Sequence, residues 1–261
     1  MPSTHEIDQV TCEFCGRELR RVVLPDWAID LAAITEADVN PAYERCDCEQ
    51  AVRLRTERLE AKWEAEAIAA VGDAKSRMRA SAMRAGIPEG YVLEGMDDKA
   101  LYAELLKTLD AGCGLFLTGG TGTGKTHAAC AVAQRFLRCG KTVRFADPEQ
   151  IEREVKASWG RMANDDEASV ISRYVTADLV VIDDLGAEQM GTVTMKALRA
   201  VISGREANGR PTVFTSNLTR EQLAQRIADG TDEVMADRLA SRIKGMTRMF
   251  AFGGPDRRIS R

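Results

Sequence analysis

The segment Gly119-Gly120-Thr121-Gly122-Thr123-Gly124-Lys125-Thr126 decides the fold. It fits the pattern Gly-x4-Gly-Lys-Ser/Thr, follows the apolar run Leu115–Leu117 and opens a stretch that we expect to be helical over residues 125–138. Glycines let backbone N–H groups approach phosphate oxygens without a Cβ atom in the way, and the helix that follows adds a positive N-terminal dipole. A chance glycine-rich turn is the alternative, but strand, helix, lysine and threonine all occur in the order that a phosphate-binding loop requires.

This loop predicts a binding site for ATP and Mg²⁺. We expect the backbone of residues 119–124 to surround the phosphates and Lys125 to reach the β- and γ-phosphates. The hydroxyl group of Thr126 is the expected Mg²⁺ ligand.

Two carboxylates follow the apolar segment Leu179–Ile182, which reads as a strand buried on both faces. Asp183 is expected to hold Mg²⁺, and Asp184 to orient or deprotonate the attacking water. Asn217, after the predicted strand at residues 212–215, is placed to contact the γ-phosphate or that water. The alternatives are structural, because Asp-Asp-Leu-Gly suits a turn and Ser-Asn can begin a turn or cap a helix.

Short apolar runs alternate with amphipathic stretches from Leu115 onward, which predicts a parallel sheet with helices on both faces. The sequence predicts strands at residues 115–117, 143–145, 179–182, 212–215 and 249–252, and helices at residues 125–138, 149–158, 167–174, 195–207, 221–227 and 233–244. The proline-free stretch Glu49–Arg84 is rich in Ala, Glu, Arg and Lys and predicts one long helix that ends at Gly86-Ile87-Pro88. Val52, Leu59 and Trp63 fall on one face of it, which predicts a packed side.

Four cysteines lie within the first fifth of the chain, as Cys12-Glu13-Phe14-Cys15-Gly16 and Cys46-Asp47-Cys48. Four thiolates can complete a tetrahedral Zn²⁺ site, and such a site can fold a block too small for its own core. The Cys-x-Cys pair is tighter than the usual Cys-x2-Cys, and His5 is an alternative ligand. Free thiols are the other interpretation.

The composition is that of an ordinary globular protein, with 44% hydrophobic and 29% charged residues. We find no apolar run of membrane-spanning length and no secretory signal at the N-terminus, and we therefore expect a cytoplasmic protein without membrane contacts. The net charge of −4 carries no global signature of nucleic-acid binding. Residues 1–50 are acidic and residues 238–261 are basic, which suggests different partners for the two ends.

Taken in order, several motifs resemble the AAA+ ATPases of the bacterial replicative helicase loader family (DnaC/DnaI type), of which the IstB-like transposition helpers are close relatives. They are the phosphate-binding loop, Val181-Ile182-Asp183-Asp184-Leu185-Gly186, Thr215-Ser216-Asn217 and Asp237–Ile243, preceded by the lead-in Met83–Tyr91. The resemblance covers roughly residues 80–261.

This resemblance implies further roles. Arg242 matches the arginine finger, which acts on the ATP of a neighbouring subunit, and Arg258 resembles the second sensor arginine, with Arg257 as the alternative. The segment at residues 147–162 corresponds to an insertion that touches single-stranded DNA, where Trp159 is a candidate for base stacking or for packing. Loaders of this type also carry a small N-terminal zinc domain that contacts the helicase.

The sequence therefore predicts a zinc-binding module at residues 1–50, a helical linker at 51–86 and an AAA+ ATPase domain at 87–261. The expected cofactors are ATP, Mg²⁺ and Zn²⁺. The expected function is the ATP-dependent loading of a hexameric replicative helicase onto single-stranded DNA, by a protein that forms a homo-oligomer when it binds ATP. Two alternatives are a transposition helper that binds DNA and a transposase, and an ATP-bound adaptor with negligible turnover, which the short Asp184 keeps open.

Overall fold

The computed structural model describes residues 10–22, 42–43, 45–160, 165–228 and 233–256. The chain divides into two compact units, residues 1–73 and residues 74–261. The three predicted segments, 1–50, 51–86 and 87–261, stay a prediction. Three of the predicted site residues, His5, Arg257 and Arg258, lie outside the described residues.

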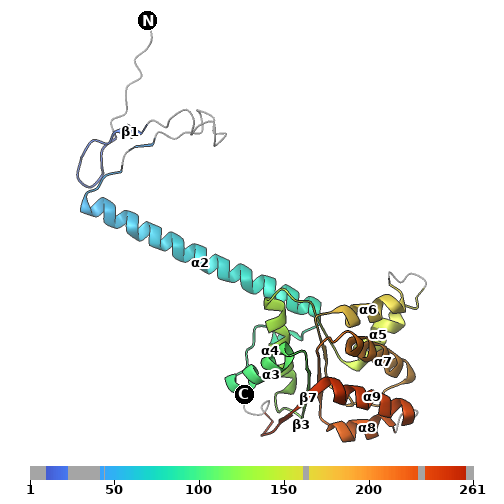
Figure 1. The fold of residues 1–261 in the computed structure, drawn as a ribbon. Coiled ribbons are helices and arrows are strands. Elements are labelled where there is room, and N and C mark those ends of the chain that lie inside the picture. Colours follow the sequence, from blue (N-terminus) through green and yellow to red (C-terminus); the bar gives the residue numbers. More distant parts are fainter. Residues whose placement is uncertain (1–9, 23–41, 44, 161–164, 229–232, 257–261) are drawn as a thin grey trace. The chain divides into compact units, whose positions relative to one another are not determined.

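A five-stranded parallel sheet forms the centre of the unit at residues 74–261 (Figure 1). Its strands, listed in their order across the sheet, are β4 (Val143–Ala146), β5 (Leu179–Ile182), β6 (Thr212–Ser216), β3 (Gly114–Gly119) and β7 (Thr247–Phe252). Each predicted strand is present, although β3 and β7 are longer than expected. The predicted parallel α/β fold is therefore confirmed.

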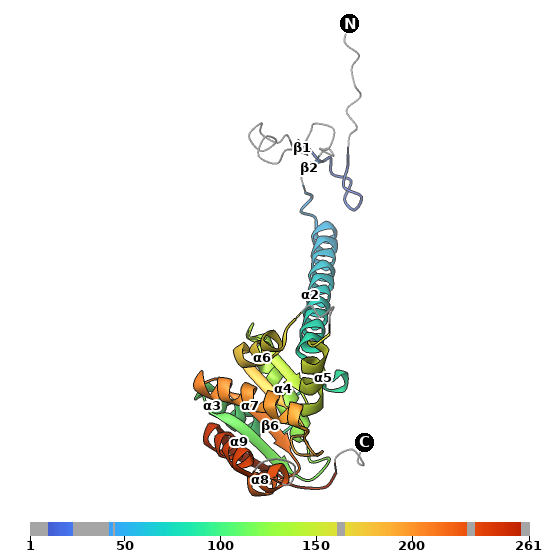
Figure 2. The same ribbon diagram turned by 90° about the vertical axis from the view of Figure 1, so that its right-hand side faces the viewer.

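Helices cover both faces of this sheet (Figures 1 and 2). One face packs against α3 (Lys99–Asp110) and α4 (Lys125–Arg138). The other packs against α5 (Pro148–Ala157), α6 (Glu167–Thr176), α7 (Thr192–Ala207), α8 (Arg220–Ala228) and α9 (Glu233–Met246). All the helices predicted in this region occur, whereas α3 and the short 3-10 helix η1 (Glu89–Tyr91) were not predicted.

The strands are apolar on both sides because they separate two hydrophobic cores. Leu115 and Leu117 of β3 point into the core beneath α3 and α4, whereas Phe116 between them points into the core beneath α5 to α9. In β5, Val180 and Ile182 face the second core. These side chains are fully buried, as the alternation of a strand with two covered faces requires.

The helix α2 (Glu49–Ala85) begins in the first unit and ends in the second. It stops at Gly86, as predicted, because this residue has a left-handed φ of +89° and a Cβ atom here would lie 2.2 Å from the carbonyl oxygen of Phe145. The predicted packed side is wrong. Val52, Leu59 and Trp63 are 41%, 48% and 60% exposed.

In the unit at residues 1–73, β1 (Arg21–Val22) pairs antiparallel with β2 (Ala42–Tyr43). A further antiparallel bridge joins Thr11 to Glu18 and closes the loop that carries Cys12 and Cys15. Across both units, none of the described helices combines the length and the apolar character that a bilayer crossing demands.

Candidate functional site

The glycine-rich loop connects the end of β3 to the start of α4. Gly119 closes the strand with a φ of +148°, and a Cβ atom there would lie 2.0 Å from the carbonyl oxygen of Phe252 on β7. Only glycine fits a position with that contact. The loop is thus held against the neighbouring strand, and the backbone N–H groups at the start of α4 carry the partial positive charge of a helix N-terminus.

Lys125 lies inside the loop, with only 5% of its surface exposed. Its Nζ donates hydrogen bonds to the carbonyl oxygens of Gly119 and Gly120 over 3.0 and 2.8 Å, and to Oδ1 of Asn217 over 2.8 Å. The ammonium group therefore joins the ends of β3 and β6. Because parallel strands end at the same edge of the sheet, the fold brings together two predicted site residues that are far apart in the sequence.

The predicted Mg²⁺ ligands also meet. Oγ1 of Thr126 donates to the Asp183 carboxylate, with distances of 3.1 Å to Oδ1 and 3.3 Å to Oδ2. A hydroxyl and a carboxylate oxygen in contact at the mouth of a phosphate loop are hard oxygen donors of the kind that Mg²⁺ prefers. The donor set fits a magnesium ion bound together with a nucleotide.

Thr215 connects the carboxylate of Asp183 to the backbone of Asp184, a role that the sequence did not reveal. Its Oγ1 donates to Oδ1 of Asp183 over 2.5 Å and accepts a hydrogen bond from the backbone N–H of Asp184 over 2.9 Å. Asp184 has a φ of +52°, which is unusual for a residue other than glycine. The hydroxyl of Thr215 holds this turn, so that Asp183 points to Thr126 while Asp184 stays exposed at the rim.

Burial raises the pKa of Asp183, and the negative charge of Asp184 raises it further. Hydrogen bonds from Thr215 and Thr126 act in the opposite direction. A carboxylate that is desolvated in this way favours a cation as its neighbour. The electrostatics of the site therefore agree with the donor chemistry.

A pocket of about 350 Å³ lies at this edge of the sheet. Lys125, Thr126, Asp184 and Asn217 line it together with residues of the glycine-rich loop. The other lining residues were not predicted as part of a site, and are Gly90, Tyr91, Glu94, Asp97 and His127. These residues, apart from His127, come from the segment before α3.

Gln134 of α4 holds the segment that carries Tyr91 and Glu94. Its fully buried side chain accepts a hydrogen bond from the N–H of Leu93 over 2.7 Å and donates one to the carbonyl oxygen of Tyr91 over 2.9 Å. Leu93 has a φ of +69°, so the amide holds a strained turn in place. The volume and the mixed polar lining of the pocket suit a nucleotide.

Arg242 is not brought to this pocket. It lies on α9, about 40% exposed, and forms an ion pair with Glu206 of α7 at 3.1 Å. The second sensor stays untested because Arg257 and Arg258 lie outside the described residues. On α5, Arg153 and Lys156 pair with glutamates of their own helix, and the exposed Trp159 donates its indole N–H to Glu167 over 2.9 Å.

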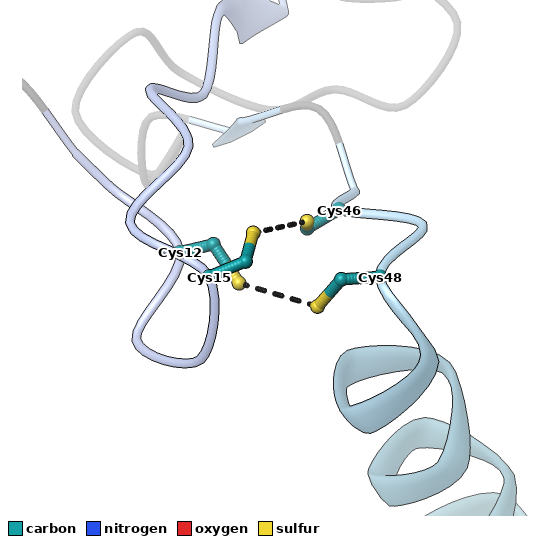
Figure 3. Close-up of side chains that lie close together, drawn as sticks. All are labelled: Cys12, Cys15, Cys46 and Cys48. Atoms are coloured by element: carbon teal, nitrogen blue, oxygen red, sulfur yellow. Dashed lines mark hydrogen bonds between the residues drawn. The ribbon is translucent and has the colours of Figure 1, made fainter.

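The four N-terminal cysteines converge (Figure 3). Sγ of Cys12 lies 3.8 Å from that of Cys48, Sγ of Cys15 lies 3.4 Å from that of Cys46, and all four lie within 4.8 Å of one another. Tetrahedral Zn²⁺ with bonds of about 2.3 Å would separate its sulfur ligands by about 3.8 Å. The backbone N–H groups of Phe14 and Cys15 lower the pKa of Cys12 to about 7, which favours the thiolate. The cluster fits a zinc module.

Comparison with known proteins gives a family match over residues 94–259, to the model described as IstB-like ATP binding protein. An ATP-binding protein in an insertion sequence of Mycobacterium tuberculosis is 27% identical over 150 residues, which are 51% of this chain and 57% of that protein. The replicative helicase loader DnaC of Escherichia coli is 25% identical over 112 residues, or 43% of this chain and 45% of the loader. The chain thus spans about half the length of these relatives.

Solved structures give the same fold. A DnaI crystal structure matches with a TM-score of 0.52 and 23% identity, covering 61% of this chain and 87% of that one. A DnaC helicase loader matches with a TM-score of 0.52 and 19% identity, covering 64% and 100%. Both matches support the predicted fold, a parallel sheet between helices.

Proposed function

We propose, since this chain belongs to the family of IstB-like ATP-binding proteins, that it hydrolyses ATP to load a hexameric replicative helicase onto single-stranded DNA. The observation that carries the ATPase part is the convergence of Lys125, Thr126, Asp183 and Asn217 at the ends of three neighbouring strands. The proposed role places the protein in the cytoplasm.

The chain's own residues account for the chemistry of ATP binding and hydrolysis. The loop N–H groups and Lys125 hold the β- and γ-phosphates, and Thr126 and Asp183 hold the magnesium ion. That ion supplies neutralising positive charge on the phosphate oxygens. The exposed carboxylate of Asp184 orients the attacking water or takes its proton, and Asn217 positions that water against the γ-phosphate.

Arg242 completes the site of a neighbouring copy in this proposal. Its guanidinium is exposed on α9 and does not line the pocket of its own chain. A guanidinium from an adjacent subunit can spread its donors over the charge that develops on the γ-phosphate. ATP bound between subunits then couples nucleotide turnover to assembly, which accounts for a homo-oligomer in the ATP state.

The cysteine cluster supplies a second binding module. Zn²⁺ held by Cys12, Cys15, Cys46 and Cys48 would stabilise a block whose described residues form only a small hydrophobic cluster. We propose that this module binds the helicase, while the ATPase domain controls the release of the helicase. The support for the helicase as partner is the similarity to the DnaC loader of Escherichia coli.

A transposition helper is the second candidate. It is favoured by the 27% identity with the ATP-binding protein encoded in a mycobacterial insertion sequence. The ATPase site serves both functions equally, so the partner decides between them.

The test is co-purification of the immobilised chain with the replicative helicase of its source organism, in ATP, in ADP and without nucleotide. Nucleotide-dependent retention of the helicase, lost in Cys46→Ser and altered in Lys125→Ala, is expected for a loader. Retention of a transposase instead would support the second candidate. An ATPase rate that stays at the background level when single-stranded DNA is added would favour an adaptor with negligible turnover.

A further inference from the structure

The carboxylate of Asp256 lies directly on the phosphate-binding loop. A Cβ atom placed on Gly122 would lie 1.8 Å from Oδ1 and 2.6 Å from Oδ2 of Asp256, so the carboxylate occupies the space beside the Gly122 α-carbon. Gly122 also lines the candidate nucleotide pocket. A negative charge from the C-terminal part of the chain therefore touches a loop whose N–H groups are suited to bind anions.

The fold fixes this contact, because β7 pairs in parallel with β3 over its whole length, from Gly114 opposite Thr247 to Gly119 opposite Phe252. The segment that follows β7 must then leave the sheet beside the loop that follows β3. Asp256 comes four residues after the end of β7, which is close enough to reach Gly122.

Like charges repel strongly at such a place. The repulsion between two charges grows as they approach and as water is excluded between them, and a triphosphate brings several negative charges. Asp256 is half-buried and stands next to a loop that an incoming phosphate chain must approach. Its carboxylate both repels the nucleotide and competes with it for the positive potential of the loop.

We propose that Asp256 sets the nucleotide affinity of this site, by opposing the binding of the polyphosphate and speeding its release. The inference rests on the proposed ATP-binding function and adds a residue to it. A residue that weakens nucleotide retention suits a protein whose ATPase domain controls the release of a partner, because the nucleotide-bound state then ends quickly.

The experiment compares Asp256→Asn with the unchanged full-length protein, using a fluorescent ATP analogue and ADP with Mg²⁺. Asparagine keeps the shape and removes the charge, so we expect binding to become about tenfold tighter, which corresponds to about 1.4 kcal/mol, mainly through slower release. The gain should shrink as salt is raised, because salt screens the repulsion. Asp110→Asn, which removes an exposed charge at the end of α3, should leave the affinity unchanged.

Equal affinities of Asp256→Asn and the unchanged protein would overturn the inference while leaving the proposed function intact. Weaker binding by the variant would also overturn it, since that is the behaviour of a residue that holds the magnesium ion or the ribose. Failure of both proteins to bind nucleotide would contradict the proposed function and, with it, the inference. Thermal melting of each variant separates these results from a loss of folding.

Discussion

The hydroxyl group of Thr215 lies 2.5 Å from Oδ1 of Asp183 and donates a hydrogen bond to it. The same oxygen accepts the backbone N–H of Asp184, so one buried side chain holds both members of the acidic motif. Thr215 is thereby a positioning residue.

Replacing Thr215 with valine keeps the shape of the side chain and removes the hydroxyl. We expect the ATPase rate to fall by about tenfold, or about 1.4 kcal/mol in the barrier, because the turn at Asp184 loses its anchor. Thr215→Ser should retain most of the activity, since it keeps the hydroxyl. Steady-state ATPase assays of both variants check this, and a fully active valine variant would contradict the positioning role.

Lys125→Ala should weaken ATP binding by about a hundredfold, or about 2.7 kcal/mol. The ammonium group is the buried cation at the centre of the loop, and alanine cannot replace its hydrogen bonds. Titration calorimetry with ATP measures the change. Lys141→Ala, which removes an exposed lysine, is the matched control and should bind like the unchanged protein. Unaltered affinity in Lys125→Ala would remove the basis of the site.

Asp183→Asn should raise the melting temperature in buffer without nucleotide or Mg²⁺. Burial raises the pKa of Asp183 in the folded protein, so the unfolded chain releases this proton at a lower pH. The folded state of the unchanged protein therefore loses stability as the pH rises through that window. The variant's advantage should be full above the raised pKa and should vanish below the ordinary pKa of about 3.9. An advantage that grows on acidification would contradict this assignment.

Arg205 is a buried arginine. Its hydrogen-bond partners are oxygen atoms of α6, of the segment that follows α6, of the loop before β6 and of β6 itself. Its guanidinium donates to the carbonyl oxygens of Tyr174, Ala177 and Pro211 over 2.6 to 2.7 Å, and to the Thr212 hydroxyl over 2.9 Å. Each buried acceptor left unpaired costs about 1–3 kcal/mol, so Arg205→Met should lower the free energy of unfolding by about 3 kcal/mol or more. Urea denaturation measures it, with Arg199→Met on the exposed side of the same helix as the near-neutral control.

The purified protein should contain about one zinc ion per chain if the cysteine cluster is a metal site. Cys46→Ser removes one of four converging thiols and should lower the zinc content several-fold, because three thiolates hold the ion less firmly. Elemental analysis measures the content. Cys139→Ser, which changes a thiol outside the cluster, should keep the metal, and a metal-free unchanged protein would exclude the zinc module.

Most of the predicted site residues that the fold brings together belong to contiguous motifs. The glycine spacing, the lysine and the threonine stand together at residues 119–126, and the strand with its two carboxylates is a local pattern as well. The positions of the strands could be predicted for the same reason, since a short apolar run between amphipathic helices indicates a buried strand. The sheet confirms the predicted strands.

Other features depend on contacts that no local pattern contains. Some of them arise where distant segments meet. These are the helix α3, the part of the pocket lined by Tyr91 and Glu94, and the hydrogen bonds that Gln134 donates to those two residues. The exposure of Trp63 on α2 was likewise not predictable, because a helical spacing of apolar residues does not reveal whether anything covers them.

The sequence by itself determined the chemistry of the phosphate loop and the parallel α/β class, because both are set by residue types at fixed spacing. Only the tertiary structure decided which side chains touch. The strand order β4-β5-β6-β3-β7 places Asp183, Thr215 and Lys125 at one edge and brings Asp256 against Gly122. The order of the strands in a sheet depends on how residues far apart in the sequence pack in the two cores. No local sequence pattern contains this information, so the folded structure is needed to see it.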